Sequence, residues 1–212
     1  MKTIGYAIAA LGFFALPLSA GDGNVLNFLQ LSTGADGNAL FIDQSEATGS
    51  LIAGDPLNIT PATQAGNGNT AEVEIRGNGG TLVLNQNNAL TGLSIGNQAE
   101  AVIAGVSGFG SILQLGDLNS ATLSVQSPDA FNPASGAIAQ IGTANTGTLS
   151  VDGAGASGEL RQIGNGNTNA LSVEGTGTTA TYTQIGNGLS NQNGGVSVVS
   201  NGGSVSITQT SF

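Results

Sequence analysis

A 22-residue repeat constrains the fold of this chain more than any other feature. The pentapeptide QIGNG occupies residues 162–166 and returns at residues 184–188, and residues 157–188 hold one complete unit and the start of the next. Self-similarity at such a period is typical of proteins that stack one unit on another. The sequence therefore predicts a stacked array rather than a single globular core.

Side chains within the unit alternate as they do on β-strands, where neighbours point to opposite faces. Leu160 and Gln162 share one face of a first strand, while Asn167, Leu171 and Val173 share one face of a second. Residues between these positions are mostly small, polar or charged. Gly and Asn separate the two strands, and both tolerate the positive φ of a tight turn. Each unit is predicted to be strand, turn and strand.

The inward face mixes aliphatic side chains with amides, which an ordinary core avoids. If each unit lies about 4.8 Å beyond the one before, each amide can donate to one copy and accept from another. Such a ladder satisfies buried amides that would be costly alone. We therefore predict an all-β fold, a β-solenoid of stacked strand-turn-strand repeats with about 22 residues per rung and amyloid-like cross-β character.

The repeat identifies candidate residues for the ladder and for the turns. The candidates for the stacking ladder and self-assembly are Gln64, Asn69, Gln114, Asn119, Gln140, Asn145, Gln162, Asn167, Gln184 and Gln209. The candidates for the repeat turns are Gly66, Gly116, Gly142, Gly164 and Gly186. At one strand spacing per rung, roughly six to eight rungs make a stack about 30 to 40 Å long.

Two irregular stretches, residues 44–63 and 126–135, each contain two prolines. Because proline cannot donate to a strand ladder, we predict loops there, with one irregular strand near Leu57 and Ile59 in the first. Residues 77–105 fit two strands but leave room for a further half-unit between them. Their register therefore stays open.

The first 20 residues predict a secretory signal peptide. Lys2 precedes an apolar run, and small residues lead to a cleavage site after Ala20. The alternative, a membrane anchor, is disfavoured because the apolar run is shorter than the roughly 20 residues that span a bilayer. We therefore expect an exported chain, residues 21–212, that is secreted and extracellular.

Composition excludes several classes of partner and of chemistry. The exported part has Arg76 and Arg161 as its cations against 13 acidic residues, so nucleic acid and membrane insertion are not expected. Without His or Cys, the common nucleophile and base pairs and thiolate metal sites are absent. Glu72 and Glu74 have outward parity, typical of a solvated face. We expect no enzyme activity, no metal and no cofactor.

The pattern Gln-x-Gly-x-x-Asn-x-Ala, within a unit of about 22 residues, resembles the curlin repeat of bacterial curli fibres. The resemblance covers most of residues 105–212, where the repeats are best defined, and more loosely residues 24–104. The best matches begin at Gln64 and Gln114, and nearly as good ones begin at Gln140 and Gln162.

This resemblance implies a curlin-like repeat domain over residues 21–212 and a structural role. A curlin is a secreted subunit that polymerises with itself into extracellular amyloid fibres, which support adhesion and a biofilm matrix. It is exported through an outer-membrane pore and nucleated by another curlin at the cell surface. The sequence departs from the family where a second inward Gln usually ends the unit, at Val73-x-Ile75, Leu123-x-Val125, Leu149-x-Val151 and Leu171-x-Val173. Whether it is a major subunit or a nucleator stays open.

A second hypothesis remains. A secreted β-solenoid that stays monomeric could serve as a binding module or adhesin through the loops at residues 44–63 and 126–135. Protected ends would distinguish it from a polymer, because open strand edges recruit further strands.

Overall fold

The computed structural model describes residues 22–32, 36–57, 60–88, 95–191 and 194–211. These residues form β-strands and turns and contain no helix. No helix long and apolar enough to cross a membrane was found among them. The expected signal peptide lies outside the described residues.

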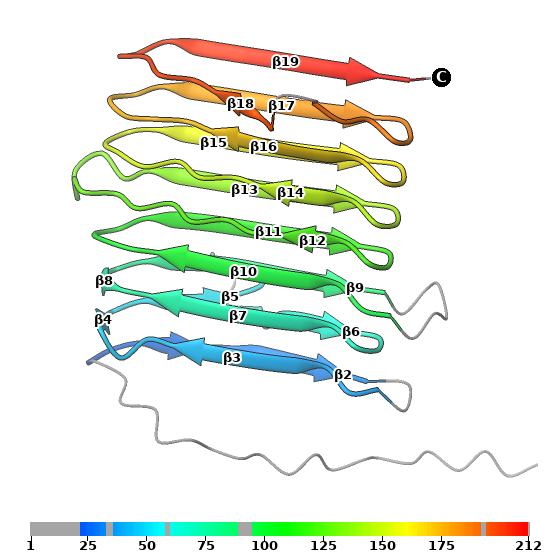
Figure 1. Ribbon diagram of the computed structural model, residues 1–212. Helices are drawn as coiled ribbons and strands as arrows, with labels where there is room; N and C mark the ends of the chain where they lie inside the picture. The colour runs from blue at the N-terminus through cyan, green and yellow to red at the C-terminus, as the bar shows by residue number, and fades with distance from the viewer. Residues whose placement is uncertain (1–21, 33–35, 58–59, 89–94, 192–193, 212) are drawn as a thin grey trace, which may run out of the picture.

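The strands stack into a β-solenoid of about seven turns, which confirms the predicted fold class (Figure 1). Every pair of neighbouring strands in the two large sheets is parallel. The ten-stranded sheet comprises β1 (Val25–Leu26), β2 (Phe28–Leu31), β5 (Leu51–Ala53), β6 (Ala62–Ala65), β9 (Thr81–Asn87), β11 (Phe109–Leu115), β13 (Ser135–Ile141), β15 (Ser157–Ile163), β17 (Thr179–Ile185) and β19 (Ser204–Thr210).

The second large sheet forms the opposite wall of the stack, and its strands run in the opposite direction (Figure 1). It comprises β3 (Ala39–Asp43), β7 (Thr70–Ile75), β10 (Gln98–Ile103), β12 (Ser120–Ala121), β14 (Thr146–Thr148), β16 (Thr168–Ser172) and β18 (Val196–Ser197). A small sheet at one side pairs β4 (Ala47–Thr48) with β8 (Gly77–Asn78). One rung is a strand of the ten-stranded sheet, the following turn and a strand of the seven-stranded sheet.

The spacing between equivalent residues varies, although the register of the stack does not. It is 22 residues from Gln140 to Gln162 and from Gln162 to Gln184, as the repeat predicts. It rises to 34 residues between Gln30 and Gln64, and rungs are about 26 residues apart on average. Insertions account for the difference, because each leaves the stack and returns to the same position.

The loop predicted over residues 44–63 is too long: Ala47–Thr48, Leu51–Ala53 and the start of Ala62–Ala65 are strands, so the insertion is confined to residues 54–61. Leu51–Ala53 and Ala62–Ala65 pair with one continuous strand, β9, so they are two halves of a single interrupted strand. The expected strand near Leu57 and Ile59 is therefore wrong in position: Leu57 is 91% exposed, and Ile59 lies outside the described residues. Ile52 and Ala62 occupy successive inward positions, so the chain leaves the strand after Ala53 and re-enters it at Ala62.

The open register of residues 77–105 is also resolved. β9 and β10 belong to the same rung, because β9 pairs with β11 while β10 pairs with β12. No separate half-unit is inserted into either sheet there. The extra residues belong to the connection between the two strands, which includes residues 89–94 outside the described part.

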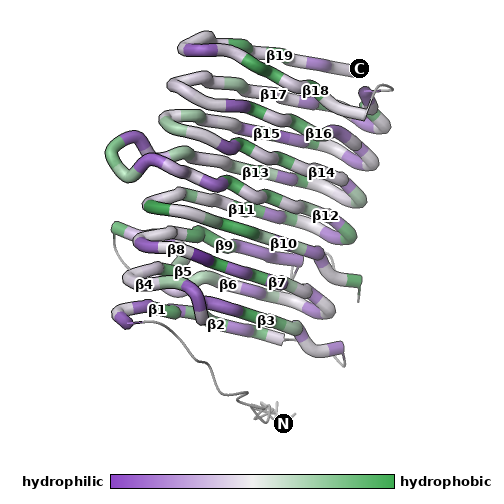
Figure 2. The backbone as a smooth tube through the Cα atoms, turned by 60° about the vertical axis from the view of Figure 1, so that its left-hand side comes forward, coloured by the Kyte–Doolittle hydropathy of each residue, from purple (hydrophilic) through white to green (hydrophobic). Residues whose placement is uncertain are grey.

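Aliphatic side chains from both sheets fill the interior. Figure 2 shows hydrophobic and hydrophilic positions alternating along the strands. The aliphatic pairs that replace the second glutamine of the curlin pattern are all buried. Two of these pairs lie beyond the ends of the short strands β12 and β14. The φ angle is positive at Ser124, within the first of these pairs, and at Asp152, directly after the second.

The turn glycines allow rungs to approach closely. Gly164 has φ 116°, and its N–H donates to the carbonyl oxygen of Ile141 in the preceding rung. A Cβ on Gly164 would overlap the carbonyl oxygen of Gly186 in the following rung. The turn therefore needs glycine for both conformation and space.

We predict that Gly164→Ala destabilises the chain more than Gly166→Ala. Both positions have positive φ, which costs an L-residue roughly 1–2 kcal/mol. Nothing lies near the added Cβ of Gly166, whereas that of Gly164 meets backbone. Overpacking should cost Gly164→Ala about 1–3 kcal/mol more. Urea unfolding of the two variants measures the difference, and equal losses would contradict this account of the turn.

Candidate functional site

A ladder of glutamine side chains runs through the interior along the whole stack. The Nε2 of each glutamine donates to the Oε1 of the next one toward the C terminus, at 2.7–3.1 Å. The side chains between the two ends are fully buried. The members are Gln30, Gln64, Gln86, Gln114, Gln140, Gln162, Gln184 and Gln209.

The same Nε2 atoms also join the two walls of the solenoid. Gln114 Nε2 donates to the carbonyl oxygen of Gln98 at 2.8 Å, and Gln162 Nε2 donates to that of Thr146 at 2.9 Å. In the six members between the two ends, both amide hydrogens are thus used, one along the axis and one across the core. A buried amide deprived of a partner would cost about 1–3 kcal/mol.

A second ladder, of asparagines, runs beside the turns in the opposite direction. The Nδ2 of Asn119 donates to the Oδ1 of Asn97, and that of Asn145 to the Oδ1 of Asn119, both at 3.0 Å. Along this ladder the donors point toward the N terminus, while the second hydrogen of each of these two Nδ2 groups goes to a glycine carbonyl oxygen of the following rung. The members are Asn38, Asn69, Asn97, Asn119, Asn145 and Asn167. The next equivalent position is Leu189, whose backbone N–H donates to Asn167 Oδ1.

Every ladder residue proposed from the sequence lies in one of these two ladders, and all five turn glycines have φ between 104° and 131°. Four members were missed: Gln30, Asn38, Gln86 and Asn97. Gln86 lies on the inward face of β9, but the glycine of the repeat pattern does not follow it. The long connection between β9 and β10 separates it from Asn97. Gln30 and Asn38 fit the sequence pattern of a first unit, whereas only the alignment of neighbouring rungs identifies Gln86 and Asn97.

Both ends of the glutamine ladder keep an unused hydrogen-bonding atom among the described residues. Gln30 donates to Gln64, and its own Oε1 receives no donor. At the other end Gln209 Oε1 accepts from Gln184 and Tyr182, while its Nε2 donates to no described group. No described strand covers β19 on its outer side or β1 and β2 on theirs.

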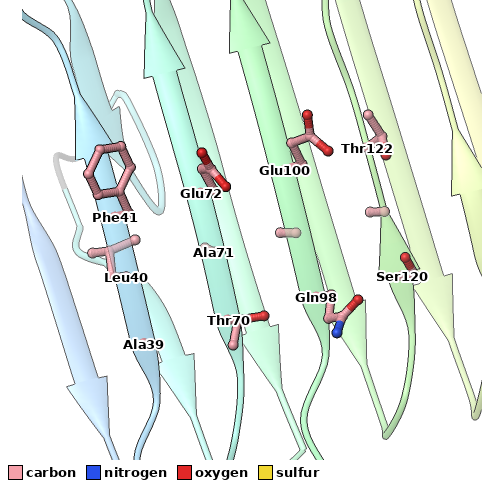
Figure 3. Close-up of a pocket in the computed structure, with 12 residues that line it drawn as sticks. Ala39, Leu40, Phe41, Thr70, Ala71, Glu72, Gln98, Glu100, Ser120 and Thr122 are labelled. Carbon is pink, nitrogen blue, oxygen red and sulfur yellow. The ribbon is translucent and has the colours of Figure 1, made fainter.

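A shallow hollow of about 390 Å³ lies on the outer face of the seven-stranded sheet (Figure 3). It is lined by three successive residues of each of β3, β7 and β10 and by β12 with Thr122, and the outward side chains of these segments form its walls. Glu72 and Glu100 stand directly opposite each other there on neighbouring strands. Among the described residues no group of three His, Cys, Asp or Glu side chains is arranged to hold a metal ion.

The predicted loop between β12 and β13 is ordered and exposes an aromatic side chain. Phe131 is 94% exposed, and its N–H donates to Asp129 Oδ1 at 2.9 Å. This bond, followed by one from Asn132, lowers the pKa of Asp129. Gly155 N–H fixes the loop to the following rung through the Asn132 carbonyl. The loop therefore presents Phe131 on a prearranged backbone.

Comparison with known proteins identifies no relative. No family model matches the chain, and no match was found among curated proteins or among solved structures.

We predict that Gln114→Met destabilises the chain by about 2–4 kcal/mol, because Gln86 Nε2 loses an acceptor and Gln140 Oε1 loses a donor. Methionine closely matches glutamine in shape, so packing changes little. Gln30→Met is the comparison, since it breaks one ladder bond where Gln114→Met breaks two, and it should cost about half as much, because only Gln64 Oε1 loses its donor. Chemical unfolding measures both, and equal values would exclude a role of the ladder in stability.

Proposed function

We propose that this chain is a structural subunit of secreted, extracellular amyloid fibres of the curli type. It assembles with itself by adding rung upon rung, and the fibres support adhesion and a biofilm matrix. The observation that carries the proposal is the glutamine ladder, which spans the whole stack and has an unused donor at one end and an unused acceptor at the other.

The two ends are complementary. Gln30 and Gln209 occupy the same ladder position, and Phe28 and Ile207 share one core position. If β1 and β2 of a second copy paired with β19, Gln209 Nε2 would donate to Gln30 Oε1 and the ladder would continue. Two β19 strands facing each other would oppose donor to donor. Head-to-tail stacking is therefore favoured.

The outer edge of β19 also has the character of a recruiting edge. It carries no proline, lysine or other charged residue, the features with which many proteins block edge pairing. The backbone N–H of Thr179 donates to Gly203 in the following rung. Ser204 pairs in register with Thr179, and Ser206 lies two residues further along the same strand. Their N–H groups therefore also point toward the C-terminal end of the stack, where no described strand accepts them.

The resemblance to curlins supplies the remaining parts of the proposal. They are export by the signal peptide at residues 1–20, passage through an outer-membrane pore, and nucleation by another curlin. The excess of acidic residues disfavours nucleic acid and anionic membranes as partners. The proposed role is structural and not catalytic.

A second candidate function is favoured by the loop that carries Phe131. An exposed aromatic residue on a prearranged loop suits a binding module, because little conformational entropy is lost on contact. In this case the chain would act as a secreted monomer, and its ends would stay uncovered without recruiting copies.

The test follows purified residues 21–212 by thioflavin fluorescence and fibre diffraction. A polymer should show a lag, growth that preformed fibres accelerate, and a reflection near 4.8 Å. A β-rich chain that stays monomeric would contradict the fibre proposal and favour the binding module.

We predict that Ser206→Pro slows fibre elongation about tenfold or more, because it removes an N–H from the open edge. Its bonds to β17 should survive, since that N–H points away from β17. Ser206→Val is the matched control and should elongate like the unaltered chain. Seeded growth rates compare the three, and equal rates would contradict edge addition at β19.

A further inference from the structure

The hollow on the seven-stranded sheet has two parallel rows of side chains along the stack axis. The acidic row is Phe41, Glu72, Glu100 and Thr122, and the polar row is Ala39, Thr70, Gln98 and Ser120. The rows are two residues apart on each strand, roughly 6.6 Å. Figure 3 shows the side chains of both rows projecting from the sheet.

Glu72 and Glu100 carry charges that no described cation neutralises. Like charges directly opposite each other on neighbouring strands destabilise a sheet. The nearby Arg76 is engaged elsewhere, by Glu74 at 2.5 Å and Glu46 at 3.6 Å. The hollow therefore favours a cationic group from outside the chain.

The ten-stranded sheet carries the complementary feature on its outer face. Arg161, on β15, is exposed and forms no ion pair among the described residues. Its neighbours across the sheet, Ala139 and Thr183, are small, so the guanidinium stands above a flat surface. Glu159 is also exposed and lies two residues before it, the same spacing as that between the two rows.

We propose that the hollow binds Arg161 of a second copy, so that filaments associate face to face. This inference rests on the proposed fibre function. Arg161 would reach the carboxylates of Glu72 and Glu100, whose geometry suits the five donors of a guanidinium. Glu159 would then face the polar row, where Thr70 and Gln98 offer donors.

The same match fixes the relative direction of the two filaments. Glu159 precedes Arg161 on β15, and Gln98 precedes Glu100 on β10, so the two strands must run the same way. Within one copy the two sheets run in opposite directions (Figure 1). The second copy must therefore be turned end for end, and the associated filaments are antiparallel.

A single exposed contact of this kind is weak and screened by salt. Along a filament, however, it recurs once in every copy, and linked weak contacts add to a stable association. The insertion at residues 54–61 leaves the sheet between β5 and β6, four strands from β15, so it does not cover Arg161. Lateral association should thus be strong at low salt and should fall as salt rises.

The test uses two variants of residues 21–212. Arg161→Glu and the double variant Glu72→Arg/Glu100→Arg should each lower the fraction of paired filaments about fivefold or more in electron micrographs. Mixing the two variants restores opposite charges across the interface and should restore pairing. Glu174→Arg, at an exposed position outside the hollow, makes the same kind of charge change and should leave pairing unaltered.

Pairing that survives Arg161→Glu, or that mixing does not restore, would overturn this inference. Growth of single filaments in either variant would leave the proposed function intact. If the chain does not polymerise, analytical sedimentation of the unaltered chain and of the same variants at low salt measures the fraction of side-by-side dimers. Absence of fibres then counts against the proposed function, while absence of charge-dependent dimers counts against this interface.

Discussion

The hydrogen bond between glutamines of successive rungs is the interaction on which the structure depends. A buried amide needs both a donor and an acceptor, and no single rung supplies both. Gln114 finds them in Gln86 below and Gln140 above. This requirement sets the register of the stack, because a shift of one residue would turn the amide outward. It also explains why insertions are tolerated wherever they leave the ladder positions in place.

The two ladders run in opposite directions, and this arrangement has an electrostatic consequence. Amide donors point toward the C terminus in the glutamine ladder and toward the N terminus in the asparagine ladder. Their side-chain dipoles therefore oppose each other along the axis, whereas two ladders in the same direction would add. The two ladders therefore add less to the dipole of a growing stack than two ladders in the same direction would. The glutamine ladder itself stays directional, because one of its ends has an unused acceptor and the other an unused donor.

The sequence predicted the features that depend on the pattern of residues within one repeat. Alternating parity identified the inward aliphatic residues, and the Gln-Gly-Asn pattern identified most ladder members. The prediction failed where the position of a strand depends on the neighbouring rungs. Leu51–Ala53 is too short to be recognised as a strand from its sequence, and it belongs to the stack because it pairs with β9. Glu72 and Glu100 are likewise separated by 28 residues, with an insertion between them, so their alignment was not visible before the fold.

Fibre formation and display of a binding loop are compatible in this architecture. The loop that carries Phe131 leaves the stack after Ser127, whose carbonyl oxygen still accepts from the N–H of Val106 in the preceding rung, and it returns at Ala134. It is fixed to the following rung by Gly155, so its conformation does not depend on the ends of the chain. In a head-to-tail fibre, Phe131 would recur once per copy at regular intervals. A contact too weak for a monomer would then gain from repetition, because a second binding event on one fibre is effectively intramolecular.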